Sequence, residues 1–172
     1  MAQPPSPGPV RRRGFVTKRI TVPGNLRQAC DEFNSGRFFE CHETLEEIWQ
    51  EEPGPVRDLY KGLIQAAAAF VHVTRGNAAG AARLLRTSAG YLAPYGTEGA
   101  MGFDVAAVRD ALEAASVELA RIAPGAVETL SPGWQPEFRL DNSRLPAEAV
   151  RWAAWGFDTH GNALEMEITV PE

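Results

Sequence analysis

The chain has 172 residues, of which 44% are hydrophobic and 23% charged, and its net charge is −5. This composition is typical of one soluble globular domain, and the negative charge argues against nucleic-acid binding, which requires a basic face. The longest apolar run, residues 66–71, is far too short to span a membrane, and no secretory signal opens the chain. We therefore expect a cytoplasmic protein.

The first third of the chain predicts a tail followed by two helices. Residues 1–22 carry prolines and scattered charges, which predict a disordered or loosely docked tail. Helical periodicity begins after Asn25, which we expect to cap the first helix. A turn at residues 34–36 separates this helix from a second one over residues 37–50.

Three further helices are expected, over residues 56–74, 78–92 and about 105–122. Asn77 and Asp104 precede the last two and can cap them. The predicted fold is therefore mainly α, a compact bundle of about five helices within a domain at residues 23–124.

Residues 125–172 form a C-terminal extension in this interpretation. Apolar residues from Leu164 to Val170 alternate with polar ones, and this period of two indicates a strand. Residues 152–157 are either the hairpin partner of that strand or the end of a short helix. We expect a small β or irregular addition to the helical domain.

The second predicted helix places a histidine and a glutamate on one edge of its apolar face. On a helical wheel His42 lies about 40° from Phe38, and Glu46 lies about 40° beyond His42. Glu43 lies further round, toward solvent. This spacing predicts a His42–Glu46 pair at the boundary of the core.

The third predicted helix carries only two polar side chains between residues 62 and 73, Gln65 and His72. They are seven residues apart and therefore share a face. Burying them without partners would cost about 1–3 kcal/mol each. We expect them to converge with His42 and Glu46, within direct or water-bridged hydrogen-bond reach, because an antiparallel hairpin would bring the two helices together.

Three interpretations of this cluster stay open. One is a network of hydrogen bonds that fixes the packing of the helices. Another is a divalent-metal site with the ligands His42, Glu46 and His72, and with Glu43 as a base or as a group behind the ligands. The third is a metal-free acid–base or small-ligand site, in which Glu46 orients His42 and the ligand is bound by Gln65 and His72.

A family resemblance rests on these same residues. The pattern starts with Phe33-Asn34-x-Gly36-x-x-x-Glu40-x-His42-Glu43-x-Leu45-Glu46-x-x-Trp49 and continues with Gly62-Leu63-Ile64-Gln65-x-Ala67, His72 and Arg75-Gly76-Asn77. Over about residues 26–95 it resembles the domain-of-unknown-function 309 family. The resemblance implies a small, mainly helical intracellular protein and makes His42, Glu46, Gln65 and His72 motif positions. It implies no substrate.

The function expected from these features is that of a helical domain with a buried His/Glu/Gln cluster. The cluster would bind a divalent metal ion or a small ligand and carry out hydrolase-type chemistry, with His42, Glu43 and Glu46 as the catalytic residues. The alternative is a non-enzymatic module that binds a partner protein through a groove between helices.

Overall fold

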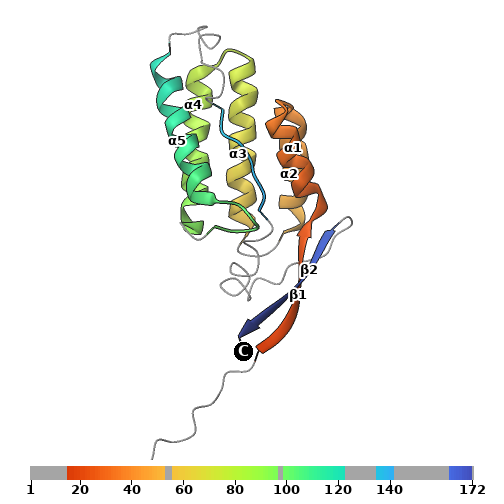
Figure 1. Cartoon of the computed structure of the whole chain (residues 1–172). Helices are drawn as coiled ribbons and strands as arrows, with labels where there is room; N and C mark the ends of the chain where they lie inside the picture. Colours follow the sequence, from red (N-terminus) through yellow and green to blue (C-terminus); the bar gives the residue numbers. More distant parts are fainter. Residues whose placement is uncertain (1–14, 53–55, 97–98, 123–134, 142–162, 172) are drawn as a thin grey trace, which may run out of the picture.

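The computed structural model describes residues 15–52, 56–96, 99–122, 135–141 and 163–171. Five α-helices within these residues pack into a bundle (Figure 1). They are α1 (Gly24–Asn34), α2 (Phe38–Glu51), α3 (Arg57–Thr74), α4 (Ala78–Leu92) and α5 (Val105–Arg121). A 3-10 helix, η1 (Ala93–Tyr95), follows α4. The predicted mainly α fold and the bundle of about five helices are confirmed.

The helix α3 lies at the centre of the bundle, between α2 and α4, and α5 packs on α4 (Figure 1). Leu63, Ala66, Ala67 and Phe70 of α3 are buried. The alanines let the neighbouring helices approach α3 closely. This arrangement confirms that the apolar third helix belongs to the core and is flanked by the second. None of the described helices is both long and apolar enough to cross a bilayer.

The helices α3 and α4 approach each other closely at Gly62. Ser88 Oγ of α4 donates a hydrogen bond of 2.7 Å to the Gly62 carbonyl oxygen, and both residues are buried. A Cβ atom on Gly62 would lie 2.7 Å from Cδ2 of Leu92, which is closer than two carbon atoms pack. The crossing therefore requires glycine at this position.

Two of the three predicted helix caps are confirmed. The Asn77 side chain accepts a hydrogen bond of 2.9 Å from Gly80 N, and the Asp104 carboxylate accepts one of 3.1 Å from Ala107 N. The third prediction is wrong, because Asn25 lies inside α1, which begins at Gly24 directly after a strand. The helix starts one residue before the capping signal.

The strands β1 (Phe15–Pro23) and β2 (Ala163–Pro171) pair antiparallel, with Phe15 opposite Pro171. The C-terminal strand was predicted, but its partner is the segment before α1 and not a neighbouring one. Residues 15–22, which the sequence assigned to the tail, thus form most of a strand that is rich in β-branched residues. Residues 1–14 and 152–157 lie outside the described part of the chain, and the division at residues 22 and 124 stays a prediction.

Residues 135–141 contribute to the core of the helical bundle. The Phe138 ring stacks on that of Phe33, with 3.8 Å between the centroids and 4° between the planes. The Asn34 side chain clamps the backbone of Phe138, accepting from its N–H and donating to its carbonyl oxygen, each at 2.8 Å. Part of the C-terminal extension therefore packs as an integral piece of the bundle.

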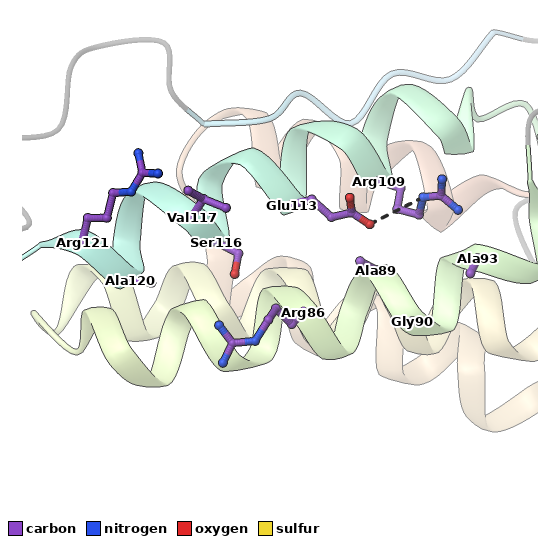
Figure 2. A pocket seen from close by; sticks show the side chains of 10 residues that line it. All are labelled: Arg86, Ala89, Gly90, Ala93, Arg109, Glu113, Ser116, Val117, Ala120 and Arg121. Atoms are coloured by element: carbon purple, nitrogen blue, oxygen red, sulfur yellow. Dashed lines mark ion pairs between the residues drawn. The ribbon is translucent and has the colours of Figure 1, made fainter.

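A surface groove lies between α4 and α5 (Figure 2). Its volume is about 610 Å³. The sequence did not predict this groove, because the pattern of each helix alone is that of an ordinary amphipathic helix.

Candidate functional site

The candidate site lies on one edge of α2. The helix buries Phe38, Cys41 and Leu45. His42 and Glu46 follow at the side of this apolar face, one turn apart, and Glu43 lies next to His42. Their side chains are 25%, 37% and 56% exposed, respectively. The pair therefore sits at the core boundary as predicted, but it is open to solvent and not buried.

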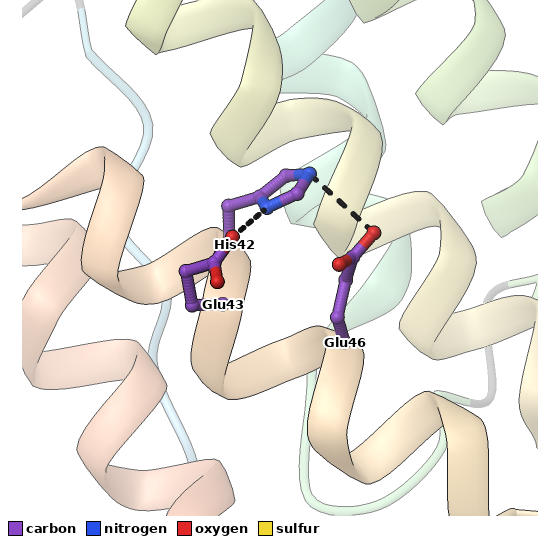
Figure 3. A group of neighbouring side chains, drawn as sticks. All are labelled: His42, Glu43 and Glu46. Atoms are coloured by element: carbon purple, nitrogen blue, oxygen red, sulfur yellow. Dashed lines mark hydrogen bonds and ion pairs between the residues drawn. The ribbon is translucent and has the colours of Figure 1, made fainter.

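The His42 ring lies between two carboxylates (Figure 3). Nδ1 is 3.3 Å from Oε1 of Glu43, and Nε2 is 3.7 Å from Oε1 of Glu46. One potential ligand atom from each of the three residues lies within 4.8 Å of the other two. These three side chains form the His42 cluster.

The protonation of the imidazole decides which of its nitrogens can bind a ligand. The donor and acceptor in the contact between Nδ1 and Glu43 depend on the tautomer of the imidazole. In the tautomer with the proton on Nδ1, that N–H donates to the Glu43 carboxylate and Nε2 carries a lone pair on the side of Glu46. That nitrogen can accept a proton or bind a metal ion, while Glu43 holds the ring in place.

Gln65 and His72 do not join the cluster. Nδ1 of His72 is 3.0 Å from Nδ2 of Asn77, and the His72 carbonyl oxygen accepts hydrogen bonds from the backbone of the turn after α3. No hydrogen bond or ion pair among the described residues links Gln65 or His72 to His42 or Glu46. Direct hydrogen bonds among these four residues are therefore not formed in the described part of the chain, and His72 lies outside the group of potential metal ligands that His42, Glu43 and Glu46 form. A convergence bridged by water stays a prediction.

The physical reason is that the two α3 residues are only partly buried. Water can solvate the Gln65 amide and the His72 ring at the edge of the helix, so neither needs a protein partner. Apolar side chains such as Leu63, Ala67 and Phe70 fill the core around α3 instead. The sequence argument assumed complete burial, which an apolar run does not guarantee on every side of a helix.

A buried carboxylate that the sequence analysis missed lies behind α2. Glu32 of α1 is only 4% exposed, and it accepts hydrogen bonds from Thr44 Oγ1 at 2.8 Å and Gln28 Nε2 at 2.9 Å. A glutamate in an amphipathic helix is usually exposed. Glu32 lies three residues after Ala29 and therefore on the core side of α1, and this spacing could have predicted its burial.

The Trp49 ring near the end of α2 contacts two basic side chains of α3. The Arg57 guanidinium lies 4.0 Å from the centroid of the Trp49 ring and the Lys61 ammonium 4.6 Å from it. Arg57 also donates hydrogen bonds to the carbonyl oxygens of Trp49 and Glu52, at 2.6 and 2.8 Å. This cation–π cluster fixes the end of α2 beyond Glu46.

Comparison with known proteins shows that this site lies in a segment that matches a family model. The family model called "Domain of unknown function (DUF309)" matches residues 26–84. The resemblance to this family is confirmed over these residues. The DUF309 segment contains α1, α2, α3 and the first part of α4, and therefore the whole cluster around His42.

A curated relative supports the same assignment. The Bacillus subtilis (strain 168) protein named "Uncharacterized protein YpuF" is 51% identical to this chain over 59 residues. The match covers 33% of this chain and 34% of that protein, so the chain spans about a third of the relative's length. No solved structure matches the chain significantly.

Proposed function

We propose that this chain binds a divalent transition-metal ion through Nε2 of His42 and the carboxylate of Glu46, with Glu43 orienting the histidine ring. The observation that carries this proposal is the grouping of one ligand atom from each of the three side chains within 4.8 Å. Their partial exposure favours a ligand site over a purely structural network, because a network that fixes packing would be buried.

The distances fit an ion of this class. Zinc lies about 2.0–2.2 Å from imidazole nitrogen and carboxylate oxygen, and two atoms 3.7 Å apart can both lie at that distance from one ion. An imidazole with a carboxylate suits zinc, iron or nickel better than calcium or magnesium, which prefer oxygen ligands. Glu43 supplies the carboxylate behind the histidine that commonly supports such sites.

The chemistry proposed for the site is hydrolysis of a small molecule. Two protein ligands leave coordination positions for water and substrate, and a metal ion bound this way makes water a stronger nucleophile. The same small number of ligands implies weaker binding than in a structural zinc site. We therefore propose an exchangeable metal ion.

The test is metal binding by untagged protein. Equilibrium dialysis against zinc, nickel and manganese, followed by elemental analysis, should give about one ion per chain for at least one metal. His42→Ala and Glu46→Gln should each lower the affinity about 10-fold or more, and Glu43→Gln should lower it less.

His72→Ala is the matched control, because it removes the other histidine of the matched segment and leaves the cluster intact. Its affinity should equal that of the unchanged protein. If His72→Ala weakened binding as much as His42→Ala did, the ligand set proposed here would be wrong. Metal binding that survived His42→Ala would reject the site altogether.

A further inference from the structure

The groove between α4 and α5 has an open, apolar floor (Figure 2). Ala89 and Gly90 of α4, with Ala93 of η1, line one side, and Val117 and Ala120 of α5 line the other. The Val117 side chain is 48% exposed, and a Cβ atom added to Gly90 would meet no atom within 4 Å. Small residues on both helices leave room for a bulky apolar occupant.

Three arginines stand along the groove. Arg121, Arg86 and Arg109 follow one another along its length in Figure 2. Glu113 is the one carboxylate among the lining residues, and its Oε1 lies 3.8 Å from Nε of Arg109. Glu118, which does not line the groove, lies 3.9 Å from Nη1 of Arg121. The lining itself has three arginines and one glutamate, so it is positively charged on a chain whose net charge is −5.

One of these arginines makes no ion pair within the described part of the chain. Arg86 has no carboxylate within ion-pair distance there, whereas Arg109 and Arg121 each face one glutamate. The Arg86 and Arg121 side chains are exposed, so the carboxylates of an acidic ligand can reach both guanidinium groups.

The groove between α4 and α5 is long enough for a ligand larger than a small molecule. A second cavity of about 290 Å³ shares the lining residues Arg86 and Ala120 with this groove and continues along α4 to Gly76. Arg109 and Arg121 lie 12 residues apart on α5, which corresponds to about 18 Å along the helix axis. One head group cannot reach both of these arginines, whereas an extended ligand with several carboxylates can.

We propose that this groove binds an acidic amphipathic helix of a partner protein. The apolar face of that helix would lie on the alanine, glycine and valine floor, as in other helix-in-groove complexes, and its flanking carboxylates would contact Arg86, Arg109 and Arg121. Charge complementarity and groove length select this occupant. A nucleic acid would match the charge but not the apolar floor.

The experiment uses the full chain and a fluorescein-labelled synthetic peptide of about 15 residues, the length of α4. Leucine and alanine occupy one helical face of the peptide, and glutamate occupies both flanks. Fluorescence anisotropy should show binding at least about tenfold tighter than that of the same peptide with lysine in place of glutamate. The affinity should fall as salt is raised.

Three variants locate the binding. Gly90→Leu fills the floor from an exposed helical position with open space above it, so it should fold and should weaken binding about tenfold. Arg86→Glu should weaken binding by at least as much. Arg83→Glu is the matched control, because Arg83 is exposed on the same helix and does not line the groove, so binding should change less than about twofold.

Several outcomes would overturn the proposal. They are equal binding of the two peptides, no binding of the acidic peptide, affinity unaffected by Gly90→Leu in a variant that folds, or an equal effect of Arg83→Glu and Arg86→Glu. Self-association of the chain, abolished by Arg86→Glu and not competed by the peptide, would assign the groove to a second copy instead. None of these readouts depends on the metal proposed at His42.

Discussion

Thr44 of α2 donates a hydrogen bond of 2.8 Å to the carboxylate of Glu32 on α1, and both residues are buried. Because Thr44 lies between His42 and Glu46 in sequence but points into the core, this contact fixes the rotation of α2 about its own axis. The rotation decides which edge of α2 faces solvent. The buried contact therefore positions the exposed cluster.

Replacing Thr44 with valine should destabilise the protein. The valine keeps the volume but removes the donor to a buried carboxylate, and a hydrogen bond to a charged group contributes about 1.5–3 kcal/mol. Thr44→Ser keeps the hydroxyl and should cost less. Urea denaturation gives both free energies of unfolding, and equal losses in the two variants would mean that the methyl group, not the hydrogen bond, matters at this position.

The helical core was predictable because local signals and burial agree there. The apolar stripes of α4 and α5, with Asn77 and Asp104 ahead of them, identify both helices and their starts. The pairing of β1 with β2 was not predictable, because the two strands are far apart in sequence and the local pattern of a strand does not determine which strand it pairs with. The packing of Phe138 on Phe33 was hidden for the same reason.

The candidate site was predictable only within one helix. The i, i+4 spacing of His42 and Glu46 is a local property of α2, and the structure bears out that proximity. Convergence with Gln65 and His72 depended on how far α3 is turned toward α2, which its apolar composition does not determine. The hydrogen bond between Glu32 and Thr44 was not predictable, because it depends on how α1 and α2 pack against each other.

Alanine at two glycine positions should have opposite effects. In a helix interior alanine is favoured over glycine by about 0.5–1 kcal/mol. Gly90→Ala should therefore stabilise the protein, because its Cβ meets nothing within 4 Å. Gly62→Ala should destabilise it by about 1–3 kcal/mol, because the new Cβ overlaps the buried Leu92 side chain. Thermal unfolding of both variants checks this, and a stabilised Gly62→Ala would show that the α3–α4 crossing relaxes easily.

Loss of the Asn77 side chain should weaken the turn between α3 and α4. Asn77 caps α4 through Gly80 N and also contacts Nδ1 of His72. An asparagine cap is worth about 0.5–2 kcal/mol relative to alanine. Asn77→Ala should cost about 1 kcal/mol in chemical denaturation, and Asn77→Ser, which retains a capping oxygen, should recover most of it. An equal cost in both variants would assign the effect to the His72 contact, which serine is too short to replace.

Folding stability should fall steeply on the alkaline side. Burial raises the pKa of Cys30 from 9.0 to about 12 and that of Tyr95 from 10.0 to about 12. Because the folded state holds these protons more tightly, the stabilisation is fully present below the unfolded pKa values and is lost as pH rises from about 9 toward 12. Each pKa unit corresponds to about 1.4 kcal/mol. Urea denaturation from about pH 8 to 11 should show this decline, and Cys30→Ala should reduce its slope between about pH 9 and 10. A flat profile for the unchanged protein would mean that the two groups reach solvent without unfolding.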